Sequence, residues 1–201
     1  MTKSITGWCA PLPIANVDTD IIMPKRFLKT ITREGLAEGA FADLRFDDEG
    51  DPRPEFVLNK EPWRKASILV VGDNFGCGSS REHAVWGLVQ LGIQACIGTG
   101  FAGIFYDNAR KNGLALPIVD SDCRDHLLRF ADKGQRSDLS IDIAERTLRA
   151  DGKTYEFKMD DATRQSLLDG RDDTLDTLKL INEIQTYESN LDAVRRVRVL
   201  K

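Results

Sequence analysis

The hydrophobic positions of the chain change their period around residue 75. Before it, Ser67-Ile68-Leu69-Val70-Val71 is a short β-branched apolar run, which is typical of a buried strand. After it, the apolar residues of 84–91 recur at the spacing of one helix face. Between the two runs, Gly72, Gly76 and Gly78 favour a backbone that bends sharply or approaches another group closely. The pattern therefore predicts a strand, a glycine-rich loop and a helix in direct succession.

Strands and helices continue to alternate after this unit. Apolar runs and helical spacing predict a strand, a helix, a strand and a helix at 94–97, 101–112, 114–119 and 122–130. Three short alternating strands then follow at 139–143, 146–149 and 154–157, with Asp151-Gly152 as a hairpin turn. The succession indicates an α/β fold with a partly parallel sheet, followed by a β-meander in the C-terminal half.

The N-terminal residues are less regular. Residues 5–14 are apolar but interrupted by glycine and proline, which predicts an irregular or edge-strand start. A helix is predicted at 32–44, and the charged, proline-containing segment 47–54 is expected to be an exposed loop.

The C-terminal end is predicted to be helical and then loosely held. Helices are expected at 160–168 and 174–187. Residues 1–190 are expected to form a single domain, and 191–201 a flexible tail.

Composition narrows the possible functions. The chain has 201 residues, a net charge of −4 and a pI of about 5.3, which argues against a nucleic-acid-binding protein. It has no apolar run long enough to span a membrane, and its first residues do not resemble a secretory signal. We therefore expect a cytoplasmic protein with no membrane or nucleic-acid partner.

The four cysteines do not form a metal-binding pattern. None are spaced as Cys-x-x-Cys, and no histidine pair accompanies them, so we expect no metal site made by this chain alone. Cys9, Cys96 and Cys123 are interpreted as small buried hydrophobic residues. Cys77 lies in the glycine-rich loop, where packing in a tight turn is the main interpretation and proximity to chemistry the alternative.

The sequence Ser79-Ser80-Arg81-Glu82-His83 carries the candidate chemistry. A helix start presents unpaired N–H groups that attract anions, and the planar guanidinium of Arg81 fits a carboxylate or phosphate. The alternative is a capping box, in which Ser79 caps the helix and Glu82 reaches back. We favour a functional site because a cap needs only one hydroxyl, whereas five polar side chains gather here.

A second polar cluster lies near the N-terminus. Asp18 and Asp20 could act as a carboxylate pair, or they could fix a turn by accepting hydrogen bonds from nearby backbone N–H groups. The turn is the favoured interpretation.

Two motifs resemble those of a known family. Asn74-Phe75-Gly76-Cys77-Gly78-Ser79-Ser80-Arg81-Glu82-His83 is similar to the signature of the swivelling domain of the aconitase superfamily. Asn16-Val17-Asp18-Thr19-Asp20-Ile21-Ile22-Met23-Pro24 is similar to a second signature, and both occur in the free-standing small subunits of 3-isopropylmalate dehydratase. The resemblance is strong over 14–119 and weaker to about residue 188. It implies a swivelling β/β/α domain with a partly parallel sheet flanked by helices.

The resemblance also implies an activity and a partner. Members of this family belong to a hydro-lyase of leucine biosynthesis, which interconverts 2-isopropylmalate and 3-isopropylmalate by dehydration and rehydration. A [4Fe–4S] cluster is carried by a larger partner subunit, in a heterodimer or heterotetramer, and the small subunit is inactive alone. This chain would bind a small diacid and no metal of its own.

Residue roles follow from the same resemblance. Ser79 is expected to be the catalytic base, and Ser80 and Arg81 to bind a substrate carboxylate. The resemblance also makes Lys29 a candidate substrate-binding residue, in the loop that selects the substrate's side group. A cation does not suit an isopropyl group, and the alternative is that Lys29 points to solvent. The remaining motif residues are expected to support the loop: Gly76, Cys77, Gly78, Glu82, His83, Asp18 and Asp20.

Three alternatives remain open. The chain could belong to a related dehydratase that acts on another substituted malate, or it could be a non-catalytic anion-binding module. A cysteine hydrolase built on Cys77 would need His83 or His126 beside it.

Overall fold

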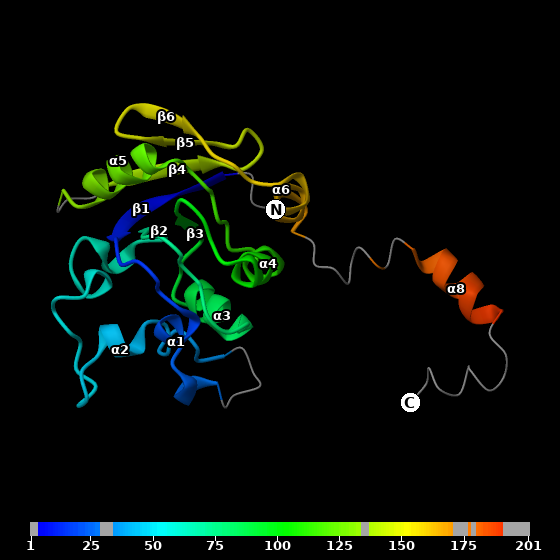
Figure 1. Cartoon of the computed structure of the whole chain (residues 1–201), viewed down its shortest axis with the longest axis horizontal. Coiled ribbons are helices and arrows are strands. Elements are labelled where there is room, and N and C mark those ends of the chain that lie inside the picture. The colour runs from blue at the N-terminus through cyan, green and yellow to red at the C-terminus, as the bar shows by residue number, and fades with distance from the viewer. Residues whose placement is uncertain (1–3, 29–33, 134–136, 171–176, 178–179, 191–201) are drawn as a thin grey trace. The chain divides into compact units, whose positions relative to one another are not determined.

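The computed structural model describes residues 4–28, 34–133, 137–170, 177 and 180–190 (Figure 1). The chain divides into two compact units after Gly170. The first unit contains the sheet and both sequence motifs, and the second contains helix α8 (Ile181–Ser189). Within the helix predicted at 174–187, residue 177 and residues 181–187 are helical, residue 180 is in a turn, and 174–176 and 178–179 lie outside the described residues. The predicted tail 191–201 also lies outside them. The extent of a domain over 1–190 stays a prediction.

The first unit is built on one mixed sheet. Its strand order is β3-β2-β1-β4-β5-β6, and the strands span Ser4–Leu12 (β1), Ile68–Val71 (β2), Ala95–Ile97 (β3), Asp138–Asp142 (β4), Thr147–Ala150 (β5) and Lys153–Glu156 (β6). The first three spatial neighbours are parallel and the rest antiparallel. The predicted α/β class, the partly parallel sheet and the β-meander are therefore confirmed.

Strand β1 lies in the middle of the sheet, so the prediction of an irregular or edge-strand start is wrong. Its first half pairs with β4 and its second half pairs with β2. The amide of Cys9 donates to Ser137 O at 3.0 Å, which places the odd-numbered N–H groups of this half on the side of β4. The nitrogen of Pro11, which carries no hydrogen, therefore faces the side of β4 beyond the last residue pair of the β1–β4 ladder. The proline interrupts no strand pairing for this reason.

The helices of the first unit are mostly where the pattern predicts them. The α-helices span Thr19–Ile22 (α1), Ala42–Arg45 (α2), Glu82–Gln90 (α3), Gly103–Lys111 (α4), Ser121–Ala131 (α5) and Asp161–Asp169 (α6). Short 3₁₀ turns lie at Lys25–Phe27 (η1), Val57–Asn59 (η2) and Trp63–Lys65 (η3).

The helix predicted at 32–44 is wrong where the structure describes it. Residues 34–41 form turns, and only Ala42–Arg45 is helical. Phe41 has a φ of 55°, a left-handed conformation that a continuous α-helix cannot contain. Residues 32 and 33 lie outside the described residues.

The strand predicted at 114–119 is reduced to isolated bridges. Ala115 pairs with Ala95 and Ile118 with Gly98, both in parallel, so the segment runs beside β3. Pro117 lies between these bridges and has no N–H to donate, which accounts for the broken ladder.

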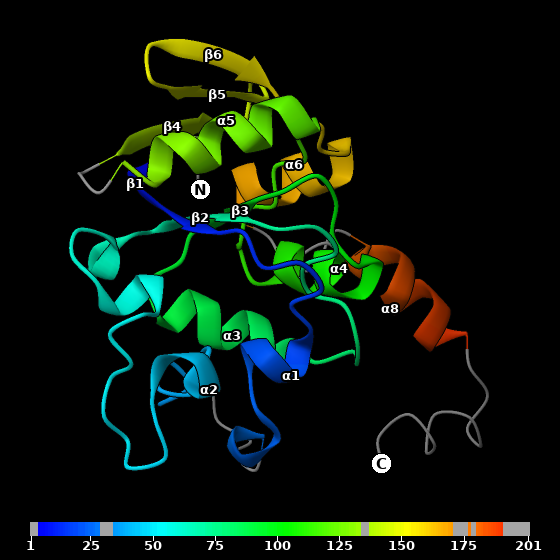
Figure 2. The ribbon, with the colours of Figure 1, turned by 60° about the vertical axis from the view of Figure 1, so that its left-hand side comes forward.

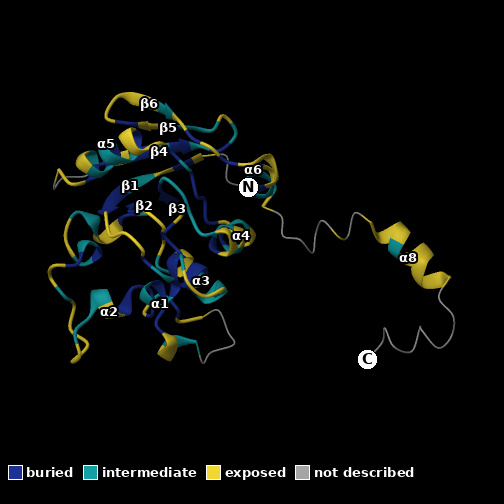
Figure 3. Ribbon diagram, in the orientation of Figure 1, coloured by how far each residue is buried: buried dark blue, intermediate teal, exposed yellow. Residues whose placement is uncertain are grey.

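Two hydrophobic cores cover the two faces of the sheet. Leu69 and Val71 of β2 pack into one core with α3 and α4, whereas Ile68 and Val70 pack into the other with α5 and α6. Figure 2 shows α3 and α5 on opposite sides of β1 and β2, and Figure 3 shows β2 and the second half of β1 buried. The continuous apolar run is explained because β2 is covered on both faces. The apolar residues of α4 do not all face the core, since Phe105 and Ala109 are buried but Ile104 is 54% exposed.

Within the described residues, no helix combines the length and the apolar character that crossing a membrane requires.

Candidate active site

The glycine-rich loop joins β2 to α3 through a series of left-handed residues. Asn74, Gly76 and Gly78 have φ values of 57°, 78° and 91°. A Cβ on Gly76 would lie 2.3 Å from the ring of Phe105, and one on Gly78 would lie 3.3 Å from Asp18 Cβ. Glycine is therefore required at Gly76 both for backbone conformation and for the close approach of α4.

The N-terminal motif binds this loop directly. The Gly76 amide donates to Val17 O at 2.8 Å, and the Thr19 amide donates to Cys77 O at 2.9 Å. The hydroxyl of Thr19, a residue only 2% exposed, donates to Ser79 O at 2.9 Å across a sequence separation of 60 residues. The two sequence motifs thus form one structural unit, and the second holds the backbone of Ser79.

The two aspartates of the N-terminal motif have separate partners. Asp18 Oδ1 accepts a hydrogen bond from the Ile21 amide at 2.8 Å and caps α1. This supports the turn interpretation for Asp18. Asp20 instead accepts from Arg81 Nη1 in an ion pair.

The ion pair orients the guanidinium of Arg81. The Arg81 side chain is 16% exposed and that of Asp20 is 41% exposed. The hydrogen bond from Arg81 holds the pKa of Asp20 below its usual value. A guanidinium has five N–H donors, so Asp20 can fix the orientation of Arg81 while other donors remain for a second carboxylate.

This ion pair predicts a pH-dependent stability. Because the pKa of Asp20 is depressed in the folded chain, its contribution is present above about pH 4 and is lost as the pH falls through the folded pKa. We expect Asp20→Asn to lower the free energy of unfolding at pH 7 by no more than about 1 kcal/mol, since solvent screens this half-exposed pair. The difference should shrink at pH 3 in urea titrations.

Asp48→Asn, which removes a carboxylate from the exposed loop after α2, is the matched control. A deficit of the Asp20→Asn protein that grows as the pH is lowered would contradict the assignment.

Ser79 and Ser80 lie before the helix and are exposed. Helix α3 begins at Glu82, its N-cap is Arg81, and no side chain caps it. The capping-box interpretation is therefore wrong, because the turn at Gly78 extends the loop past both serines before the helix starts. The Ser79 hydroxyl is not used as a cap, and it lies on the surface close in sequence to Arg81.

Glu82 contacts the end of helix α4, whereas His83 packs against Trp86 of its own helix α3. Glu82 Oε1 accepts from Asn112 Nδ2 at 2.8 Å, and Asn112 Oδ1 accepts from Trp86 Nε1 at 3.0 Å. The ring centroid of His83 lies 4.7 Å from that of Trp86. These contacts connect the start of α3 to the end of α4. The sequence analysis missed Asn112, which carries no motif and is brought in by helix packing.

Thr99 and Arg124 also position the loop, and neither was found from the sequence. Asp73 Oδ1 accepts from Thr99 Oγ1 and from Arg124 Nη1, both at 2.7 Å. These hydrogen bonds, that from Thr99 first, lower the pKa of Asp73. The position of Asp73 in the glycine-rich loop was the one sequence signal that could have pointed to these contacts. Thr99 and Arg124 lie in distant segments of the chain.

Three of the four cysteines, Cys9, Cys96 and Cys123, are buried and disfavour the thiolate form that a metal needs. Burial raises the pKa of Cys9 to about 12 and that of Cys123 to about 11, and it also raises that of Cys96. In the part of the chain that the structure describes, no three His, Cys, Asp or Glu side chains gather as a metal site. The donor set of this chain therefore does not suit an iron–sulfur cluster, which needs cysteine thiolates.

The remaining predicted residues are placed as follows. Cys77 is half-buried in the loop, and its carbonyl binds Thr19. His126 Nδ1 lies 2.9 Å from the hydroxyl of Tyr155, so the structure gives no support to a cysteine hydrolase that uses this histidine. Lys29 lies outside the described residues.

Comparison with known proteins agrees with this architecture. Residues 1–122 match the family model for the aconitase C-terminal domain. The chain is 50% identical over 187 residues to a 3-isopropylmalate dehydratase small subunit of Brucella canis, covering 92% of each chain. It is 48% identical over 186 residues to one of Azorhizobium caulinodans, again covering 92% of each. A crystal structure of a 3-isopropylmalate dehydratase of Methanocaldococcus jannaschii is similar with a TM-score of 0.66 and 28% identity, over 90% of this chain and 99% of that one.

Proposed function

The chain belongs to the aconitase C-terminal domain family, among the small subunits of 3-isopropylmalate dehydratase, and we propose that its Ser79 loop is half of an active site that a large subunit completes. The predicted family and aconitase-type fold are confirmed by these matches. As a member of this family, the chain is a component of a hydro-lyase of leucine biosynthesis.

The observation that carries the proposal is the exposed Ser79, whose backbone is bound by a buried threonine and which lies two residues from an oriented guanidinium. The difficult step in dehydrating a malate is removal of a weakly acidic proton from carbon. Ser79, acting as an alkoxide, accepts that proton while the hydroxyl leaves the adjacent carbon and a carbon–carbon double bond forms. Addition of water in the opposite sense completes the isomerisation.

The surroundings of Ser79 favour its anionic form. The dipole of α3 places partial positive charge at the start of the helix, and Arg81 adds a permanent one. Ser80 and Arg81 bind a carboxylate of the diacid, with the planar fork of Arg81 setting its orientation. Asp20 holds that fork in place.

We infer that the [4Fe–4S] cluster belongs to the large subunit, because the buried thiols of this chain do not suit it. When bound there, a cluster with an open iron supplies a Lewis acid for the departing hydroxyl. A heterodimer or heterotetramer located in the cytoplasm is the corresponding assembly.

The side group of the substrate depends on the loop that includes Lys29. An isopropyl group is the substituent that the family name gives, whereas a cation at Lys29 favours a carboxyalkyl group. A related dehydratase acting on another substituted malate is thus the second candidate. Copurification with the large subunit, followed by assays on alkyl- and carboxyalkyl-malates, tests both candidates. The proposed function fails if the purified complex dehydrates no substituted malate.

Arg81→Lys is expected to weaken substrate binding more than it slows turnover. Lysine keeps the charge but loses the bidentate fork, so we expect KM to rise by about tenfold or more while kcat falls less. Steady-state kinetics of the reconstituted enzyme give both values. Arg110→Lys, at the end of α4, is the matched control. An unchanged KM would remove Arg81 from the substrate site.

A further inference from the structure

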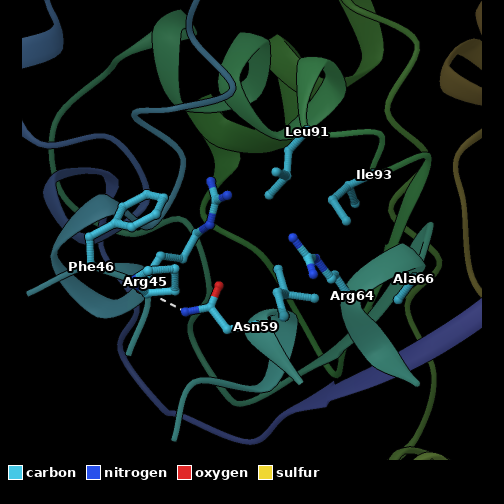
Figure 4. Close-up of a pocket in the computed structure, with 9 residues that line it drawn as sticks. Arg45, Phe46, Asn59, Arg64, Ala66, Leu91 and Ile93 are labelled. Carbon is cyan, nitrogen blue, oxygen red and sulfur yellow. Dashed lines mark hydrogen bonds between the residues drawn. The ribbon is translucent and has the colours of Figure 1, made fainter. Parts of the chain in front are cut away.

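A cavity of about 250 Å³ lies at the other end of helix α3 from the Ser79 loop. Leu91 and Ile93, which follow α3, line one part of it, and η2 and η3 supply the opposite wall (Figure 4). Leu58, Ala66 and Ile93 are almost fully buried, so the apolar part of the lining is held in place by the core. Arg45, Asn59 and Arg64 supply the polar part. The cavity is thus a preformed hollow that combines apolar walls with a few polar groups, which is the usual form of a small-molecule site.

Arg45 enters this cavity from α2 and is only partly satisfied. Its Nη1 donates to Ala37 O at 2.8 Å and to Ala40 O at 3.1 Å, and its Cζ lies 4.8 Å from the ring centroid of Phe46. These contacts fix the guanidinium in place. Its Nε is buried and has no hydrogen-bond partner. Burial lowers the pKa of Arg45, while the negative charge of Glu38 acts in the opposite direction.

Arg64 brings a second guanidinium to the same hollow. It comes from η3 and is exposed, and Figure 4 shows the side chains of Arg45 and Arg64 extending into the space beside Leu91 and Ile93. Among the residues that the structure describes, neither guanidinium forms an ion pair with a carboxylate. Two like charges that face one cavity repel each other, and an anion between them would be bound by both.

We propose that this cavity binds a small organic carboxylate with an aliphatic side group, whose anionic end lies between Arg45 and Arg64 and whose apolar end contacts Leu58, Leu91 and Ile93. The two guanidiniums select the charge, and the buried apolar wall selects a branched hydrocarbon over a second polar group.

The proposed site is separate from the Ser79 loop. Helix α3 has nine residues, so its two ends are about 13 Å apart along the axis at 1.5 Å per residue. The inference therefore does not depend on the proposed function. A ligand here would contact Leu91 and Ile93, which directly follow α3. Arg81 precedes the first turn of the same helix.

The test uses the full chain and 4-methylpentanoate as the probe, followed by NMR of backbone amides. Saturable shifts are expected at amides around the cavity, Leu58 and Ile93 among them, and not at Ser79 or Arg81. Acetate has the charge without the hydrocarbon, and 4-methylpentan-1-ol has the hydrocarbon without the charge. Each should bind at least about tenfold more weakly than the probe.

Arg64→Gln is expected to weaken binding of the probe by about tenfold or more, because it removes a charge-assisted hydrogen bond. Since Arg64 is exposed, the variant should fold normally. Lys65→Gln removes the same charge from the next residue, which does not line the cavity, and should change the affinity by less than about twofold.

Four results would each overturn the proposal, and the first three concern the cavity itself. They are the absence of saturable shifts at the cavity, equal weakening by Arg64→Gln and Lys65→Gln, and binding of the alcohol as tightly as the carboxylate. Shifts confined to the Ser79 loop would also overturn it, because the probe would then occupy the proposed substrate site.

Discussion

Ser79→Ala is expected to lower kcat of the reconstituted two-subunit enzyme by about 10²–10⁴-fold while the subunits still assemble. The variant removes the hydroxyl that we propose as the base. It should leave the fold intact, because Ser79 is exposed and its hydroxyl does not cap α3. The hydrogen bond from Thr19 goes to the backbone carbonyl of Ser79, so alanine keeps it. Turnover and copurification are measured on the same preparation.

Two controls give this experiment its meaning. Ser121→Ala removes an exposed hydroxyl from the start of α5 and should leave kcat unchanged. Unfolding of the isolated Ser79→Ala chain should match that of the wild type within about 0.5 kcal/mol. If the assembled variant turns over as fast as the wild type, Ser79 is not the base.

Gly76→Ala is expected to destabilise the isolated chain by about 2–5 kcal/mol. The positive φ of 78° costs about 1–2 kcal/mol for a residue with a Cβ. The contact of 2.3 Å with the ring of Phe105 adds overpacking in a buried region, at about 1–3 kcal/mol. Because the same loop leads to Ser79, activity in the assembled enzyme should fall as well. Urea unfolding gives the stability change.

The chain offers a matched glycine series for this prediction. Gly113 has a φ of 74° with nothing within 4 Å of a built Cβ, so Gly113→Ala should cost only the backbone strain, about 1 kcal/mol. Gly100 has open space and no positive φ, so Gly100→Ala should change stability by less than about 0.5 kcal/mol. Equal effects for Gly76→Ala and Gly113→Ala would show that Phe105 yields at little cost.

Local patterns predicted well wherever the deciding interaction is local. The apolar run before the loop predicted β2, and Asp151-Gly152 predicted the turn between β5 and β6, where both residues have positive φ. The helix predicted at 160–168 is α6, Asp161–Asp169, which begins after the cap Asp160 and ends at the left-handed Gly170. Each of these depends on residues a few positions apart.

The predictions were wrong where a residue distant in the sequence determines the local structure. Pro11 suggested an edge strand, but β1 lies in the centre of the sheet. The β1–β4 ladder does not reach Pro11, so the missing N–H of the proline costs no hydrogen bond to β4. The spacing Ser79-x-x-Glu82 suggested a capping box, but Glu82 binds Asn112 on α4 and the helix starts after both serines. No property of either segment alone could have shown this.

The family, the order of most elements and the loop that carries Ser79 could be read from the chain, because they follow from short-range periodicity and from two contiguous motifs. The folded chain was needed to show that Thr19 holds the carbonyl of Ser79, that Asp20 orients Arg81 and that Arg45 and Arg64 share a cavity. Hydrogen bonds and ion pairs act over a few ångströms in space, and the packing of α1 against α3 brings together groups that lie some sixty positions apart along the chain.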